Sequence, residues 1–179
     1  ILVGCSYSGT MVTWFLQKYP HLAQGAWSMS APLKAKVDFV EYLETVSKAI
    51  HDIGGTTCSS KIRNAFVQME DLWKNKNLTE IKRIFRLCQP LNDTNTLDVW
   101  NLFGDMGSAW SGIVQYASRY GQEIENGCTS LLAIQANSDI EAYAEWVFSR
   151  WRLEGCYEHR WEAFLYWYGG IEWDSYAAE

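Results

Sequence analysis

A serine flanked by small residues near the start of the chain is the strongest candidate for chemistry. The hexapeptide GCSYSG occupies residues 4–9, where an apolar segment gives way to a helical pattern. In that context a serine can sit at the apex of a strained strand-to-helix turn, a nucleophile elbow, with its hydroxyl presented above the sheet edge. The first N–H groups of the helix then face the place where an oxyanion forms. We therefore predict Ser6 as a nucleophile and the backbone N–H of Tyr7 as an oxyanion donor.

Small neighbours belong to this prediction, because Gly4 and Ser8 would let two backbone segments approach closely. The usual motif is G-x-S-x-G, and Ser8 stands at its final glycine position. A turn without catalytic meaning is the alternative interpretation of the bare pattern. A strand before the turn and a helix after it favour the catalytic interpretation.

The flanking segments predict a β-α-β unit. Residues 1–5 are apolar and partly β-branched, as in a short buried strand, and residues 9–18 have helical periodicity that Pro20 ends. Residues 25–32 alternate apolar with small polar side chains and stop at a proline, which predicts a second strand. A strand, a helix and a strand in this order require parallel pairing.

The chain after about residue 36 has mainly helical patterns. Apolar spacing predicts a helix over 39–50 that ends at Gly54-Gly55, and another over 62–73 with Ser59 or Ser60 as its cap.

Two further helices follow. One is short and covers residues 81–85. The other begins at Ser138, which forms a capping-box pattern with Glu141, and runs to Trp151.

Composition and charge exclude several classes of partner. Of the 179 residues, 48% are hydrophobic, and the net charge of -6 comes from interleaved signs, which argues against nucleic acid. No apolar run approaches the ~20 residues of a membrane span, and no signal peptide is recognisable. Because Ile1 opens in mid-strand and the C-terminal residues lack a stop signal, we expect sequence to be missing at both ends.

Five cysteines without C-x-x-C spacing favour disulfides over a zinc or redox site. The odd count predicts either a partner outside the chain or a Cys5 that stays free and buried. Two N-x-[ST] sequons, at Asn77 and Asn92, lie in polar, turn-like stretches, as expected of glycosylated loops in an exported protein.

Blocks of residues in fixed order resemble the serine carboxypeptidase family that includes lysosomal Pro-X carboxypeptidase, dipeptidyl peptidase II and thymus-specific serine protease. The order and spacing of these blocks are far more specific than the hexapeptide alone. The matching blocks are GCSYSG (4–9), WF (14–15), KYPHL (18–22), GA (25–26), SAP (30–32), FRLCQPL (85–91), VQY (114–116) and, more faintly, RW (150–151) and CYE (156–158). After residue 158 the family usually continues with Phe-Gly, whereas this chain has His159-Arg160-Trp161.

The resemblance implies an α/β fold class. It implies a partial α/β-hydrolase, with the nucleophile-elbow β-α-β unit in residues 1–35, a largely α-helical cap domain in residues 36–165 and a tail of uncertain nature in residues 166–179. Carried over by position, Ser6 matches the family nucleophile and Tyr7 the residue that supplies an oxyanion N–H. The family's aspartate and histidine lie further along, and no stretch of this chain resembles either region.

The implied function is that of a serine-type exopeptidase which cleaves next to proline or small residues near a chain end, through an acyl-enzyme at Ser6. The implied partner is a peptide substrate, with no nucleic acid, no membrane and no cofactor, and a homodimer is an option for the intact enzyme. The implied location is secreted or lysosomal. We expect the isolated chain to be inactive, because loss of triad partners costs several orders of magnitude in rate.

Other residues have weaker claims. His159 could act as a triad base after Asp139, which agrees with the hydrolase order of residues, but order alone does not supply the geometry. His21 is better interpreted as a surface or packing residue, and His51 as a residue that suits the C-terminal end of a helix. The three histidines are scattered along the sequence, which gives a metal site little support. The aromatic stretch 161–173 could line a cleft, although such spacing is more typical of core.

Two alternative functions remain open at this stage. A lipase or esterase would share the elbow and use the helical part to bind acyl chains. A non-catalytic homologue would agree with the departures at Cys5 and Ser8 and in the C-terminal stretch.

Overall fold

The computed structural model describes residues 1–166, and its chain forms two compact units. The first is Ile1–Val40, and the second begins at Glu41. This division lies close to the predicted boundary between residues 35 and 36; the assignment of the parts to a hydrolase domain and a cap stays a prediction. Residues 167–179 are outside the description, and with them most of the predicted tail and of the aromatic stretch.

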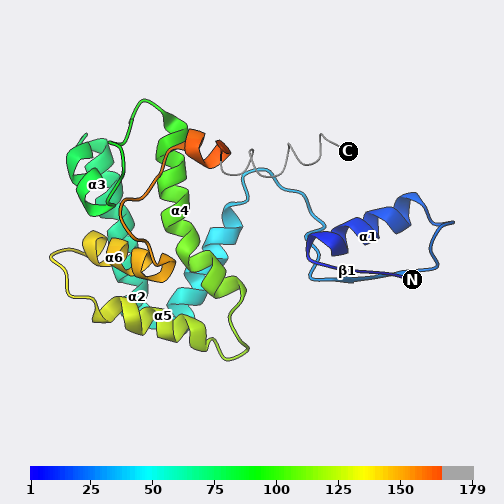
Figure 1. The fold of residues 1–179 in the computed structure, drawn as a ribbon. Helices are drawn as coiled ribbons and strands as arrows, with labels where there is room; N and C mark the ends of the chain where they lie inside the picture. The colour runs from blue at the N-terminus through cyan, green and yellow to red at the C-terminus, as the bar shows by residue number, and fades with distance from the viewer. Residues whose placement is uncertain (167–179) are drawn as a thin grey trace. The chain divides into compact units, whose positions relative to one another are not determined.

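The first unit is the predicted β-α-β element. Strand β1 (Leu2–Cys5) leads into helix α1 (Tyr7–Lys18), and strand β2 (Ala26–Met29) returns beside β1 (Figure 1). The strands pair in parallel, with Leu2 opposite Ala26 and Cys5 opposite Met29. The helix ends just before Pro20, because the residue that precedes a proline is disfavoured in the α conformation. The strand, helix and strand predicted from the sequence are thus confirmed.

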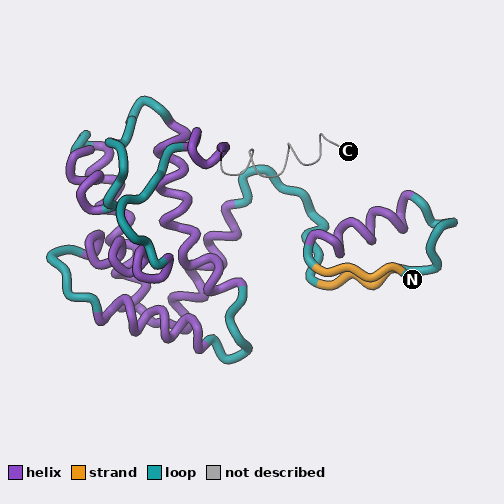
Figure 2. Tube along the Cα trace, viewed as in Figure 1, coloured by secondary structure: helices purple, strands orange, loops and turns teal. Residues whose placement is uncertain are grey.

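The second unit consists of helices joined by loops, drawn in purple and teal in Figure 2. Its helices are α2 (Val40–Lys74), α3 (Leu78–Ile84), α4 (Thr96–Gln115), α5 (Gln122–Ala133) and α6 (Asp139–Trp151), and residues 161–166 form a final helical stretch. No helix in the described chain is both long and apolar enough to cross a membrane.

Helix α2 contains the predicted break, at Gly55. Its φ of 82° and ψ of 170° lie outside the helical region, in a conformation that favours glycine. The helix resumes directly afterwards, so Ser59 and Ser60 lie inside it, and the cap predicted at one of them is wrong. A single glycine suffices for the change of direction, and no separate polar cap is required.

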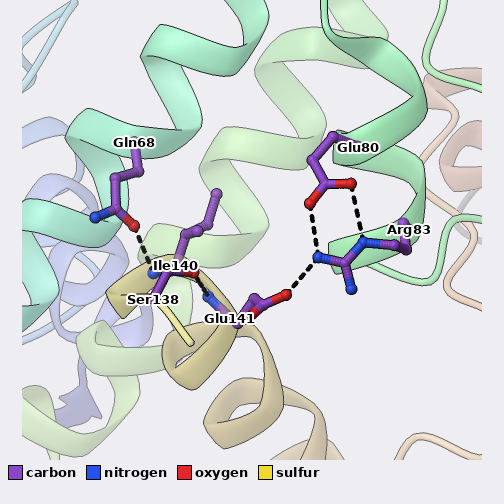
Figure 3. Close-up of polar contacts among 6 residues, drawn as sticks. All are labelled: Gln68, Glu80, Arg83, Ser138, Ile140 and Glu141. Atoms are coloured by element: carbon purple, nitrogen blue, oxygen red, sulfur yellow. Dashed lines mark hydrogen bonds and ion pairs between the residues drawn. The ribbon is translucent and has the colours of Figure 1, made fainter. Parts of the chain in front are cut away.

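Helix α6 starts where the sequence predicted, with Ser138 as its N-cap, although the Glu141 carboxylate does not complete the capping box. The Ser138 hydroxyl accepts a hydrogen bond from the Glu141 N–H at 3.3 Å, and Gln68 Oε1 on α2 accepts one from the Ile140 N–H at 2.9 Å (Figure 3). The Glu141 carboxylate also pairs with Arg83, which holds Glu80 in a two-pronged contact (Figure 3). These bonds join the start of α6 to α2 and α3.

Large aromatic side chains and two disulfides stabilise the second unit. Trp110 of α4 stacks on Trp146 of α6 with ring centroids 4.6 Å apart, and both side chains are buried. The disulfides Cys58–Cys128 and Cys88–Cys156 confirm the prediction of an oxidised chain.

Cys5 forms no disulfide, which agrees with the predicted alternative of a free cysteine, but its side chain is exposed. The predicted burial of Cys5 is wrong. Cys5 is the last residue of β1, and no described residue covers this position of the two-stranded sheet.

Candidate active site

Ser6 lies at the turn between β1 and α1 with a backbone conformation that is rare for serine. Its φ is 56° and its ψ is -128°, and holding a residue other than glycine at such angles costs about 1–3 kcal/mol. The turn is held by the hydrogen bond from the Ser6 N–H to the Met29 carbonyl on β2, at 2.9 Å. The sharp bend that the sequence predicted at Ser6 is therefore present, and its strain is the kind found at nucleophile elbows.

Two glycines make this bend sterically feasible. A Cβ atom on Gly4 would lie 2.3 Å from the Ser8 carbonyl oxygen, which is backbone and cannot move easily. A Cβ atom on Gly9 would lie 3.0 Å from the Met29 carbonyl oxygen and 3.1 Å from the Ala31 Cβ. The close approach of α1 to β2 therefore depends on Gly9. Ser8, at the motif's final glycine position, is exposed and does not make that approach.

Two hydroxyl groups that the sequence analysis did not single out fix the first turn of α1. Ser28 Oγ on β2 donates to the Gly9 carbonyl at 2.9 Å, and Thr10 Oγ1 donates to the Pro32 carbonyl at 3.2 Å. Thr10 is almost fully buried. Neither residue had a signal in the sequence, because each hydrogen bond depends on how α1 packs against β2 and the segment after it.

The start of α1 has unpaired N–H groups directly after Ser6. Ser6 occupies the N-cap position, yet its side chain caps none of the helix N–H groups. The first helical hydrogen bond runs from the Thr10 N–H to the Ser6 carbonyl, so the N–H groups of Tyr7, Ser8 and Gly9 precede it. These donors and the positive end of the helix dipole suit a developing oxyanion. Ser6 itself is exposed.

His159 has the environment of a packing histidine. It belongs to the second unit, its side chain is 0% exposed, and neither ring nitrogen has a hydrogen-bond partner. Burial lowers the pKa of His159, and the nearby Asp98 carboxylate opposes that shift. An imidazole enclosed in this way cannot meet a substrate, so its structure gives no support to a role as triad base. Asp139, the acid considered with it, instead accepts a hydrogen bond from Asn64 at 3.0 Å.

The other histidines are exposed. His21 lies in the turn after α1, and His51 lies on α2 with its Nδ1 3.3 Å from Ser59 Oγ. Within the described residues there is no cluster of three or more side chains of the kind that hold metal ions. The triad partners of Ser6 are therefore not identified among these groups.

One face of α4 binds the segment that contains His159. Asp98 Oδ1 accepts from the Trp161 N–H at 2.8 Å, and Asn101 Nδ2 donates to the His159 carbonyl at 2.9 Å. The Tyr157 hydroxyl donates a hydrogen bond to the Asp105 carboxylate. Desolvation raises the pKa of Asp105, and this hydrogen bond partly opposes the rise. The spacing of the three α4 residues puts them on one side of the helix, where they tie down the segment after the Cys88–Cys156 disulfide.

The second unit also contains a largely apolar cavity of about 970 Å³ between α2 and α4. Trp73, Phe103, Trp110 and Tyr143 line it, and Arg63 is one of its few charged residues. The indole N–H groups of Trp73 and Trp110 are buried without a partner. Cavities of this size and character are able to accept apolar groups.

Comparison with known proteins places these features in a family. A serine protease of Caenorhabditis elegans is 37% identical over 119 residues, which are 65% of this chain and 22% of the relative. Thymus-specific serine protease of mouse is 31% identical over 126 residues, 68% of this chain and 24% of the relative. Lysosomal Pro-X carboxypeptidase of mouse is 33% identical over 106 residues, 56% of this chain and 21% of the relative. The chain thus covers about a quarter or less of each of these relatives.

The family match extends beyond the blocks that carried the resemblance. The family of serine carboxypeptidase S28 matches residues 1–167, and this range includes the stretch His159-Arg160-Trp161 at which the sequence departs from the expected pattern. It spans the elbow, the described helices of the second unit and both disulfides. The chain therefore belongs to the serine carboxypeptidase S28 family.

Proposed function

We propose that the protein containing this chain is a serine-type peptidase that forms an acyl-enzyme at Ser6. The observation that carries the proposal is the strained backbone of Ser6, with φ of 56° and ψ of -128°, directly before the free N–H groups of α1. Family membership supports it, since the relatives are named as serine proteases and carboxypeptidases. Strain of this size persists only when surrounding contacts impose it, and the contacts of Gly4, Gly9 and Ser28 do so.

In the proposed mechanism Ser6 Oγ attacks the scissile carbonyl carbon. The Tyr7 N–H stabilises the negative charge that develops on the carbonyl oxygen, together with the positive end of the α1 dipole. A histidine accepts the Ser6 proton and returns it to the leaving amine, and water then hydrolyses the acyl-enzyme. We place this histidine and its aspartate outside the described residues, because no stretch of this chain resembles the family's aspartate and histidine regions and no described histidine forms a hydrogen bond with Ser6.

The architecture proposed for the whole protein is an α/β-hydrolase with an inserted helical cap. The parallel pair β1 and β2 with α1 would be part of the central sheet domain, residues 1–35, and the disulfide-bonded helices would belong to the cap, residues 36–165. The two edges of this sheet are unpaired within the described residues, so further strands of the whole protein could extend it there.

The proposed substrates are peptides cleaved near a chain end beside proline or a small residue. The name of the relative lysosomal Pro-X carboxypeptidase supports this preference. Two disulfides and the family relation support a secreted or lysosomal location. A homodimer of the intact enzyme stays a proposal without structural support.

A comparison of two substrate classes tests the activity. The natural protein that contains this chain is given a proline-containing dipeptide amide and a fatty-acid ester, beside its Ser6→Ala variant. We expect turnover of the peptide that the substitution abolishes. Turnover of the ester alone would identify a lipase or esterase, and no turnover of either would identify a non-catalytic homologue.

A further inference from the structure

Ser30 lies beside Ser6 at the carboxyl edge of the two-stranded sheet. Strands β1 and β2 run in parallel, side by side (orange in Figure 2), and their last paired residues are Cys5 and Met29. Ser6 and Ser30 directly follow this pair. The Ser6 N–H donates at 2.9 Å to the Met29 carbonyl, which belongs to the peptide unit that links Met29 to Ser30. The two serines are therefore neighbours at the edge where open α/β sheets bind their ligands.

Both serines have a left-handed backbone. The φ angle is 56° at Ser6 and 48° at Ser30, and positive values are uncommon for residues other than glycine. Glycine would hold either conformation at no steric cost, yet serine occupies both positions. Strained residues of this kind gather at active sites and ligand-binding segments. Under the proposed function the bend at Ser6 presents a hydroxyl group, and the same conformation at Ser30 presents a second one at the same edge.

The other described residues with such a backbone have ordinary reasons for it. Lys76, Arg86 and Arg152 lie just after α2, α3 and α6, where a left-handed residue commonly ends a helix. Asp38 is of a residue type that adopts this conformation readily. Ser30 follows a strand and has neither reason. Its backbone conformation therefore needs another explanation.

Contacts on both sides of Ser30 impose its conformation. Before it, the Met29 carbonyl accepts the hydrogen bond from the Ser6 N–H. After it, the Pro32 carbonyl accepts a hydrogen bond from the buried Thr10 hydroxyl at 3.2 Å. Ser30 itself is exposed, and its hydroxyl makes no hydrogen bond within the described residues. The fold thus fixes the backbone of Ser30 and leaves its side chain unused.

The two serines near the end of β2 differ in this respect. Ser28 Oγ donates to the Gly9 carbonyl at 2.9 Å and holds α1 against the sheet. Ser30 has no such structural bond, and a serine hydroxyl can both donate and accept a hydrogen bond. A peptide bound at Ser6 would offer N–H donors and carbonyl acceptors on each side of its scissile bond. The hydroxyl of Ser30 suits such a group.

We propose that Ser30 is a substrate-binding residue whose hydroxyl forms a hydrogen bond with a peptide group next to the scissile bond. The inference rests on the proposed function, because it requires a peptide that reacts with Ser6. It adds a contact by which the end of β2 orients the substrate carbonyl for attack by Ser6 Oγ. A fluorophosphonate contains no peptide group, so its reaction with Ser6 does not use this contact.

Two substitutions at Ser30 test the role of the hydroxyl in the natural protein that contains this chain. Ser30→Ala removes the hydroxyl and keeps the backbone strain, whereas Ser30→Gly removes both. We expect each variant to lower kcat/KM for a proline-containing dipeptide amide about fivefold to tenfold, as the loss of one hydrogen bond predicts. The rate at which a fluorophosphonate labels Ser6 should stay at its wild-type value. Asp38→Ala is the matched control, because Asp38 is also exposed and has a φ of 54°, and both rates should stay unchanged in it.

The two reagents separate substrate binding from a structural role. A wild-type kcat/KM in Ser30→Ala would overturn the inference. Labelling that slows as much as peptide turnover would overturn it too, because Ser30 would then act through the shape of the turn. So would wild-type kinetics in Ser30→Gly alone, because the backbone conformation would then be all that matters. If the wild-type protein neither becomes labelled at Ser6 nor cleaves the peptide, the proposed function fails and the inference fails with it.

Discussion

Removal of the Cys58–Cys128 disulfide should cost the second unit a large part of its stability. The bond joins α2 to α5 across a sequence separation of 70 residues. Closing a loop of this length removes entropy from the unfolded chain worth about 4 kcal/mol. Since domains of ordinary size are stable by about 5–15 kcal/mol, this one cross-link is a substantial fraction of the total.

The assay is urea unfolding followed by the far-ultraviolet circular dichroism of the helices. The variant Cys58→Ala/Cys128→Ala retains the Cys88–Cys156 disulfide and is compared with the wild-type chain. We expect its free energy of unfolding to fall by about 4 kcal/mol or more, because both half-cystines are buried and their sulfur atoms are lost from the core. The dependence of that free energy on urea should steepen, since the released chain exposes more surface when it unfolds.

Cys5→Ala is the matched control. Cys5 is free and exposed, so its removal should change the free energy of unfolding by no more than about 0.5 kcal/mol. A loss below about 2 kcal/mol in the double variant would refute the reasoning. It would mean that the unfolded chain is already constrained without the bond.

Three further predictions concern the elbow and the buried histidine. Gly4→Ala should slow acylation of Ser6 about 100-fold, because the added Cβ would lie 2.3 Å from the Ser8 carbonyl and displace the turn; an unchanged rate would contradict this. Ser28→Ala should slow it roughly fivefold through loss of one hydrogen bond to the first turn of α1, as the rate of labelling by a serine-directed inhibitor would show. Burial lowers the pKa of His159 in the folded chain, so as the pH falls the unfolded chain binds a proton at this histidine before the folded chain does. The free energy of unfolding of the second unit should therefore fall as the pH drops below about 6.5, by at most about 1.4 kcal/mol per pH unit. His159→Leu should flatten this part of the stability profile and His51→Gln should not, as urea unfolding at several pH values would show.

The elbow could be predicted from the sequence because its determinants are local. An apolar strand, a serine between small residues and a helical pattern follow one another within residues 1–18, and each is recognisable by itself. The structure corrected a detail, since the close approach to β2 depends on Gly9 and not on Ser8. The contribution of Ser28 could not be foreseen, because its hydrogen bond depends on the pairing of β1 with β2.

The helical character of the second unit was predictable, but several of its elements were not. Helix α4 contains three glycines (Gly104, Gly107 and Gly112), which weaken its local helical signal, and its packing against α5 and α6 compensates for them. The helix break at Gly55 was expected, whereas the cap predicted at Ser59 or Ser60 is absent because both residues lie inside the helix.

Long-range pairings had no signal in a single sequence. Which cysteines join could not be derived, because four cysteines allow three arrangements even when the fifth is left out. The contacts of Asp98, Asn101 and Asp105 with the segment around His159 likewise depend on how α4 meets a distant part of the chain. Burial of His159 follows from that packing.

Labelling of the natural protein with a fluorophosphonate tests the central claim most directly, because this reagent reacts with activated serine hydroxyls and marks the residue that it modifies. The account predicts a single adduct on the peptide that contains Ser6, and no adduct in Ser6→Ala. Absence of label at Ser6 in folded, disulfide-bonded protein, or a label on another serine that persists in Ser6→Ala, would contradict it.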